Sequence, residues 1–350
     1  MLDAVGEANA VALIGLLGGL CLGLAARLGR FCTLGSIEDF LYSSDDRRLR
    51  MWGVAIGVAM IGVYASHGWG LIDITASAYL AVKWVLLSSV IGGLLFGYGM
   101  AICGNCGYGA LARLGGGDLR SFVIVLVMAL AGYAALSGPL ASLRVWVFPV
   151  EDAAAPQGIP FLASAALGLS ASAIGILAGA AVLLVSLASR SFLSSPVQIF
   201  WGAVVGMAVL SGWLGTWWVA ETGFDAEPFE THSFVAPVGD TLFWLMTASG
   251  NSLSFSVGSV VGVLAGAFIG SLFKGHFRWE ACEDPRELRR QITGAAIMGV
   301  GAILALGCSV GQGISAFSTL SYSAPFVFLS IFAGAALGLR QLITGFAPAE

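Results

Sequence analysis

The sequence predicts an all-α polytopic membrane protein, and three features of its composition carry that prediction. Hydrophobic residues make up 58% of the 350 residues, charged residues make up 10%, and the mean hydropathy is +0.90. A soluble chain carries about 25% charged residues, which it needs to cover its surface. Glycine accounts for 49 residues, about twice its usual share of roughly 7%. Transmembrane helices use glycine where backbones approach closely or where a helix breaks, so lipid is the expected solvent for most of this chain.

Nine apolar stretches approach or exceed the roughly 20 residues that a helix needs to cross a bilayer. In chain order they are residues 9–27, 51–66, 80–102, 121–138, 161–189, 197–217, 253–273, 293–308 and 323–341. The sequence therefore predicts about nine transmembrane helices, accompanied by short or re-entrant helices.

The connections between these stretches alternate in charge. Lys and Arg gather in the first, third, fifth and seventh connections and at the end of the last stretch, whereas the other connections are acidic or poor in basic residues. Because cytoplasmic loops carry an excess of Lys and Arg, the pattern predicts an extracytoplasmic N-terminus and a cytoplasmic C-terminus. The net charge of −4 and the lack of a long basic run in the sequence give no indication of a nucleic-acid partner.

Two glycine-rich segments, residues 97–117 and 299–313, do not fit a continuous helix. Each glycine in a helix interior costs about 1 kcal/mol relative to alanine, so these segments are expected to be broken helices or re-entrant turns. At membrane depth such backbone survives only when it is buried in protein or lines a polar cavity.

The two glycine-rich segments also resemble each other. When they are superimposed, three glycines and one cysteine coincide: Gly97, Gly99, Cys106 and Gly109 fall on Gly299, Gly301, Cys308 and Gly311. The charge pattern makes the two preceding helices run in opposite directions, as in inverted repeats. The sequence therefore predicts inverted halves at residues 1–140 and 161–350, with an extracytoplasmic connection at 141–160. A weaker match of Trp52 with Trp201 does not give this inversion, so it is either accidental or a sign that one span is miscounted.

Three of the six cysteines begin the pattern Cys-x-x-Gly. They are Cys32, Cys106 and Cys308, followed by Gly35, Gly109 and Gly311. A glycine at this place is expected to let the chain turn sharply and to leave backbone N–H groups free to point at an anion. The alternative is that these thiols are small buried core residues, as free cysteines often are. One shared motif, twice at duplicated positions, favours a functional site.

Four further residues beside these turns are candidates for accessory roles. Asn105 and Gln312 are amides that either donate to an anion or satisfy the backbone of a broken helix. Arg113, seven residues after Cys106, either draws an anion to the cytoplasmic mouth or anchors that side of the protein. Cys103 is an additional thiol that shares the path with Cys106 or stands beside it.

Metal and cofactor chemistry finds little support in the sequence. The pair Cys103 and Cys106 has ligand-like spacing, but a closed tetrahedral site takes four ligands, and the sequence has no second pair of this kind. The histidines are expected away from the membrane centre, with His67 and His232 outside and His276 in the basic loop. No metal, cofactor or catalytic residue is predicted.

The cysteine segments resemble those of the YeeE/YedE family of bacterial inner-membrane sulphur transporters. The resemblance rests on Gly29–Cys32, Gly97–Arg113 and Gly299–Gly313, in matching order, and covers nearly the full length. It implies an hourglass-shaped helical protein of the bacterial inner membrane with inverted halves, which takes up thiosulfate and passes the ion between Cys32, Cys106 and Cys308. It also implies a soluble TusA-like sulfurtransferase as the recipient of the sulphur. The family includes members tied to other sulphur or selenium compounds, which leaves the substrate open.

Neutral thiols suit conduction of an anion. An S–H group is a weak donor, so it replaces part of the ion's hydration and still releases the ion, as conduction requires. Two alternatives remain at this stage. One is a membrane thiol enzyme or sulphur-relay protein that forms a persulfide or disulfide, and the other is a channel for a small neutral solute in which the thiols only pack.

Overall fold

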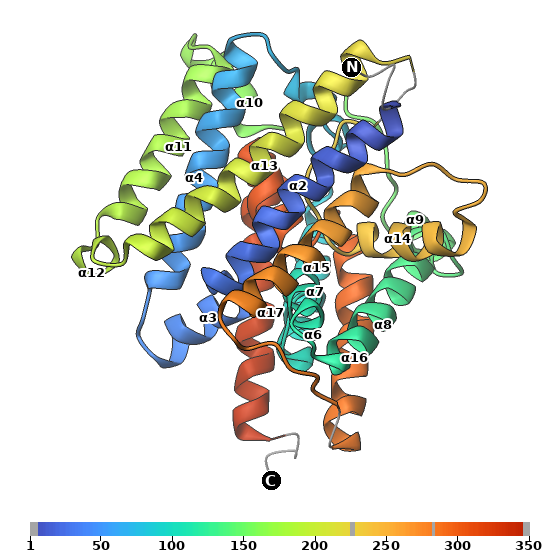
Figure 1. Cartoon of the computed structure of the whole chain (residues 1–350). Coiled ribbons are helices and arrows are strands. Elements are labelled where there is room, and N and C mark those ends of the chain that lie inside the picture. Colours follow the sequence, from blue (N-terminus) through green and yellow to red (C-terminus); the bar gives the residue numbers. More distant parts are fainter. Residues whose placement is uncertain (1–5, 225–227, 282–283, 346–350) are drawn as a thin grey trace.

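The computed structural model describes residues 6–224, 228–281 and 284–345, a part of the chain that excludes Cys282, and its regular structure is helical (Figure 1). The nine longest helices, with α11 the shortest of them, are α2 (Glu7–Leu28), α4 (Arg47–Gly68), α6 (Leu86–Cys103), α8 (Leu119–Leu136), α11 (Ala171–Leu187), α13 (Pro196–Thr222), α15 (Phe255–Phe273), α16 (Pro285–Leu304) and α17 (Ser323–Thr344). The shorter elements are α3 (Thr33–Tyr42), η1 (Ile74–Ala76), α5 (Ala78–Ala81), α7 (Gly107–Gly115), α9 (Ala141–Val147), α10 (Ile159–Leu167), α12 (Arg190–Leu193), α14 (Ala236–Thr247) and the π-helical turn η2 (Gly311–Ala316).

The expected all-α polytopic membrane fold is confirmed. Seven helices of the described chain are long and apolar enough to cross a membrane, and the bent pair α10 and α11 makes at most an eighth. The helix expected at 293–308 is part of α16, which is 20 residues long. Its first turns carry Arg286, Glu287, Arg289 and Arg290, so it falls outside the apolar set.

The prediction of one continuous span at 161–189 is wrong, because the chain bends by 117° between α10 and α11. Gly168 ends α10 with a left-handed φ of 69°. Ser170 then begins α11, its hydroxyl accepting the N–H of Ala173 at 3.2 Å. A left-handed glycine followed by a capping serine ends one helix and starts another, and hydropathy alone does not register either signal.

Glycines bring the central helices into backbone contact. A Cβ atom added at Gly19 in α2 would collide with the carbonyl of Ser259 in α15, and one at Gly262 would collide with that of Leu16. Between α6 and α17, a Cβ at Gly97 would meet the backbone of Ile331 in the same way. Such close approach is how helices associate in lipid, where hydrophobic burial gives little driving force between them.

The helices that precede Cys106 and Cys308 run antiparallel. Gly92, near the start of α6, lies against residues 301–305 of α16, whereas Gly99, near the end of α6, lies against residues 294–298. The neighbours of corresponding helices match as well. Helix α6 packs on α17, and its counterpart α16 packs on α8. In the same way α2 packs on α15, and its counterpart α13 packs on α4. This pattern is the one that inverted halves would produce.

The weak match of Trp52 with Trp201 does not belong to this pattern. It pairs α4 with α13, and these helices are parallel neighbours, because Gly202 lies against Met51 and Val54 while Gly206 lies against Ala55 and Val58. A parallel pair cannot be related by an inversion, so the match gives no support to the predicted inverted halves.

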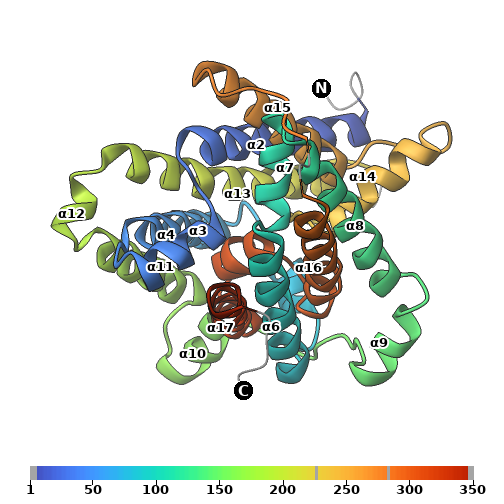
Figure 2. The ribbon, with the colours of Figure 1, turned by 90° about the horizontal axis from the view of Figure 1, so that it is seen from below.

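The central helices surround the cysteine segments. From below (Figure 2), α6 lies between α17 and α16, with α2, α13 and α15 along one side and α8 along another. The start of α2 and the end of α17 point to opposite ends of the molecule (Figure 1). The short helices α3 and α7 begin directly after Cys32 and Cys106, and the helical segment that leads into η2 begins directly after Cys308.

Candidate functional site

Each motif cysteine stands immediately before the first turn of a short helix. Cys32 is the N-cap of α3 and Cys106 that of α7. Cys308 precedes the helical segment that starts at Ser309 and leads into η2. In all three, the thiol accepts the N–H of the motif glycine, at 3.5 Å from Gly35, 3.3 Å from Gly109 and 3.4 Å from Gly311. The sulphur thus acts as the oxygen of a capping serine does, and the glycine amide is not left free as the sequence analysis expected.

The sharp turn lies before each cysteine rather than at the motif glycine. Among the described residues with positive φ are Arg30 (56°), Gly104 (83°), Leu306 (54°) and Gly307 (152°), and none of the three motif glycines is. The motif glycines instead provide space. A Cβ at Gly311 would lie 2.7 Å from the Ser233 Oγ, too close for an unshifted neighbour.

The three cysteine turns meet at the centre of the molecule. Thr33, next to Cys32, donates its hydroxyl to the Cys106 Sγ at 3.8 Å. Ser309, next to Cys308, lies beside the same Cys106 thiol. Cys106 is therefore the middle member of a row that runs from Cys32 to Cys308. Cys106 and Cys308 are 0% and 1% exposed, whereas Cys32 is partly exposed.

A basic pocket of about 420 Å³ opens on the Cys32 end of the row. Cys32, Gly35, Asn105 and Gly109 contribute to its wall. Its ionisable lining residues are Arg27, Arg30, Glu38, Arg48, Arg113, Lys274 and His276.

Four of these cations form no ion pair with any described residue. They are Arg27, Arg30, Arg113 and Lys274, whereas Arg48 pairs with Asp39 at 3.1 Å. Burial, together with the neighbouring Arg30 and Arg27, lowers the pKa of Lys274, which is the effect of crowded positive charge. A pocket with this surplus attracts anions.

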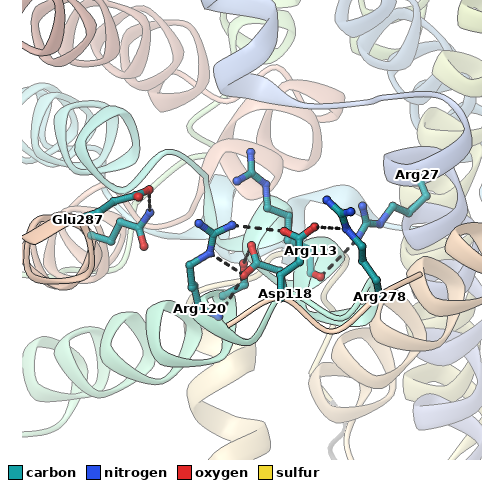
Figure 3. A network of polar contacts seen from close by, with 9 residues as sticks. Arg27, Arg113, Asp118, Arg120, Arg278 and Glu287 are labelled. Atoms are coloured by element: carbon teal, nitrogen blue, oxygen red, sulfur yellow. Dashed lines mark hydrogen bonds and ion pairs between the residues drawn. The ribbon is translucent and has the colours of Figure 1, made fainter. Parts of the chain in front are cut away.

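Figure 3 shows where the neighbouring carboxylates are engaged. Arg120 binds Asp118 at 3.1 Å and Glu280 at 3.5 Å, and Arg278 binds Glu280 at 2.8 Å. Arg27 donates to the backbone carbonyl of Arg113 at 3.2 Å, not to a carboxylate. Asp118 and Glu280 thus pair with Arg120 and Arg278 and not with the pocket cations, and the described lining of the basic pocket includes one carboxylate, Glu38.

A second pocket, of about 310 Å³, lies at the Cys308 end and shares no lining residue with the basic pocket. Its wall includes Tyr79, Trp213, Phe229 and Ser233, and its ionisable lining residues besides Tyr79 are Arg144, Glu230 and Asp240. Ser233 reaches the Cys308 thiol, with 3.7 Å between Oγ and Sγ. Tyr133 donates a short hydrogen bond to Asp240. We call this the opposite pocket.

The accessory residues fall into two groups. Asn105 and Arg113 line the basic pocket. Gln312 instead donates to the carbonyls of the broken α16, at 2.8 Å to Ala305 and 3.1 Å to Leu306, and so satisfies its backbone. Cys103 is buried against Gly294 of α16 and lines neither the basic pocket nor the opposite pocket.

His232, which the sequence predicts to lie outside the membrane, is buried within the helix bundle. Its side chain is 0% exposed, and its Nδ1 lies 2.7 Å from the Ser259 Oγ of α15. A glycine, Gly18 of α2, leaves the room that the imidazole occupies. Its place follows from the packing of α2 and α15, which the local sequence does not specify.

Sequence reasoning missed three hydroxyl residues beside the thiols: Thr33, Ser233 and Ser309. A local signal existed for two of them, because Thr33 and Ser309 directly follow a motif cysteine. Ser233 lies 75 residues before Cys308, and only the fold brings it there.

Two pockets at either end of a row of three cysteine thiols, inside a bundle of membrane-length helices, are the arrangement of a polytopic membrane transporter. The family model described as "Sulphur transport" matches residues 28–337, and the chain belongs to that family. This confirms the resemblance drawn from the cysteine segments, and the family is one of transporters and not of enzymes.

Two curated relatives cover most of the chain. "Thiosulfate transporter TsuA" of Spirochaeta thermophila is 24% identical over 321 residues, which are 88% of this chain and 92% of the relative. "Thiosulfate transporter TsuA" of Escherichia coli K12 is 24% identical over 335 residues, 86% of each.

Proposed function

We propose that this protein takes up thiosulfate across the bacterial inner membrane and passes it from the opposite pocket to the basic pocket through Cys308, Cys106 and Cys32. The observation that carries the proposal is the row of three thiols, each accepting the amide of its motif glycine, between two separate pockets in a member of the sulphur-transport family. The names of both relatives support thiosulfate as the ion.

The chemistry of the row suits a doubly charged anion. A lysine at the centre would hold a dianion too firmly, and a thiolate would repel it, whereas neutral thiols are weak donors. The first turns of α3 and α7 start at Cys32 and Cys106, and helix N-termini favour negative charge without a full positive charge. Weak sites in series let the ion enter and leave.

We assign the basic pocket to the cytoplasmic side, following the excess of Lys and Arg on cytoplasmic loops. The N-terminus is then periplasmic and the C-terminus cytoplasmic, and residues 1–140 and 161–350 are the two inverted halves, joined at 141–160. In this orientation a soluble TusA-like sulfurtransferase would receive the sulphur at the basic pocket.

Uptake of labelled thiosulfate into vesicles that contain only this protein tests the proposal. We expect uptake well above that of empty vesicles, inhibited by unlabelled thiosulfate and lost when Cys106 is replaced by alanine. Equal uptake by the wild type and the Cys106→Ala variant would remove the thiol row from the mechanism, and uptake equal to that of empty vesicles would remove thiosulfate.

A further inference from the structure

Ser309 places a buried hydroxyl beside the Cys106 thiol, directly after Cys308 in the chain. This residue begins the helical segment that leads into η2. Its side chain is 0% exposed and lies beside the Cys106 thiol. The contact lacks the geometry of a hydrogen bond, and the Oγ has no hydrogen-bond partner among the described residues. The hydroxyl therefore stands, without a described hydrogen-bond partner, beside the middle thiol of the proposed path.

Other buried hydroxyls of this segment are engaged. Ser315 donates to the carbonyl of His232 at 2.8 Å, and Ser318 donates to the carbonyl of Ser315 at 2.6 Å while it accepts from Trp213. Thr319 donates to the carbonyl of Ala316 at 2.9 Å. A buried hydroxyl without a partner is costly, so a group retained in this state at the centre of a transport path indicates a partner that arrives with the substrate.

Hydroxyl groups of other residues also lie beside the Cys106 and Cys308 thiols. Thr33 contacts Cys106 and Ser233 contacts Cys308, so each of these thiols has a neighbouring hydroxyl. Thiosulfate has two chemically different ends, three oxygens at one and a terminal sulphur at the other. A hydroxyl makes a short, strong hydrogen bond to a charged oxygen, whereas a thiol is the weaker donor.

We propose that the Ser309 hydroxyl is a substrate-binding group, which donates to the oxygen end of thiosulfate while the Cys106 and Cys308 thiols face its sulphur end. This inference rests on the proposed function. It makes Ser309 a determinant of specificity, since an ion recognised at both ends must carry oxygen and an exposed sulphur together.

The test compares Ser309→Ala with Ser318→Ala in purified protein and in vesicles. Removal of an unpartnered hydroxyl breaks no internal hydrogen bond, so Ser309→Ala should melt at or above the wild-type temperature. Its uptake should fall by about tenfold or more through a raised KM, the loss expected when one hydrogen bond to a charged group disappears. Ser318→Ala loses bonds to Trp213 and Ser315, so its melting temperature should fall, whereas uptake per folded protein should stay near the wild type.

A second variant, Ser309→Cys, nearly preserves size and keeps a weaker donor, and we expect intermediate uptake. The inference is overturned if Ser309→Ala transports like the wild type, or if its melting temperature and uptake fall together as for a structural residue. Cys106→Ala in the same assay separates the two proposals. Loss of uptake in Cys106→Ala with normal uptake in Ser309→Ala contradicts only this inference, whereas normal uptake in both contradicts the proposed function as well.

Discussion

The basic pocket and the opposite pocket lead to the same thiol row but differ in charge. Four unpaired cations surround the basic pocket at the Cys32 end. The opposite pocket has one arginine, Arg144, against Glu230 and Asp240, and its other walls are largely aromatic and apolar. The middle thiol and the thiol at the opposite-pocket end have similar neighbours, with a hydroxyl 3.8 Å from Cys106 and 3.7 Å from Cys308. The two sides of the row therefore differ in the charge of their pockets, whereas the hydroxyl contacts of Cys106 and Cys308 are alike.

In the proposed orientation, this difference in charge between the pockets fits an anion that moves into the negatively charged cytoplasm. Moving a dianion against an inside-negative potential of 100 mV costs about 4.6 kcal/mol, twice the value for one charge. Unpaired cations at the end of the path lower the free energy of the ion there. They cannot supply a net driving force, because a fixed charge acts equally on an arriving and a departing ion, so the energy for accumulation comes from another source.

The largest expected effect tests whether the thiol row connects the pockets at all. We expect Cys106→Ala to reduce thiosulfate uptake by about 10- to 150-fold, the loss of one hydrogen bond of roughly 1.5–3 kcal/mol to a charged group. Cys103→Ala is the matched control, because Cys103 is a buried thiol that packs against Gly294 of α16 and is not one of the three thiols that accept the amide of a motif glycine. Initial uptake rates at equal amounts of folded protein measure both, and equal losses in the two variants would contradict the assignment of Cys106.

The next effect concerns the charge of the basic pocket. We expect Arg113→Gln to weaken thiosulfate binding from the cytoplasmic side by roughly 5- to 30-fold, since one cation near a dianion contributes on the order of 1–2 kcal/mol. The loss should shrink at high salt. Arg47→Gln is the control, because Arg47 lies outside the pocket and is paired with Asp45. Direct efflux or counterflow assays measure the effect. Equal thiosulfate affinities of the two variants would show that the charge of the basic pocket does not contribute to binding.

A third comparison uses the motif glycines beside the middle thiol, Cys106, and beside the thiol at the opposite-pocket end, Cys308. Gly311→Ala would place a methyl group 2.7 Å from the Ser233 Oγ, so Ser233 must turn away from Cys308. Gly109→Ala meets Asn105 and Cys106 at 3.4 Å and 3.6 Å, which are ordinary contacts. We expect uptake to fall about 2- to 12-fold for Gly311→Ala, the range for one neutral hydrogen bond, and to change little for Gly109→Ala. A larger loss of uptake in Gly109→Ala than in Gly311→Ala would contradict this account of the space around the two glycines.

The smallest effect sharpens the view of the opposite pocket. Asp240→Asn removes one negative charge and keeps an oxygen that accepts the Tyr133 hydroxyl. If the carboxylate only repels the incoming ion, apparent affinity for external thiosulfate should rise by roughly two- to fivefold, about 0.4–1 kcal/mol for a screened charge. The KM for uptake measures this, and a fall in uptake would instead assign Asp240 a required role.

The sequence alone determined the fold class and the three motif cysteines. The composition predicts that lipid surrounds most of the protein, because charged residues at 10% of the sequence are too few to cover the surface of a soluble protein of this size. Glycine clusters marked the places where α6 and α16 break, since a helix interior disfavours several glycines together. Both signals are present in the sequence itself, so they can be recognised without knowing which segments pack together in the fold.

Tertiary structure decided which groups meet these thiols. Ser233 and Cys308 are 75 residues apart in the chain, and Thr33 and Cys106 are 73 apart. The unpaired state of the pocket cations likewise depends on Asp118 and Glu280 being held by Arg120 and Arg278. Contacts between distant segments arise only when the helices pack, so no pattern within one segment specifies them.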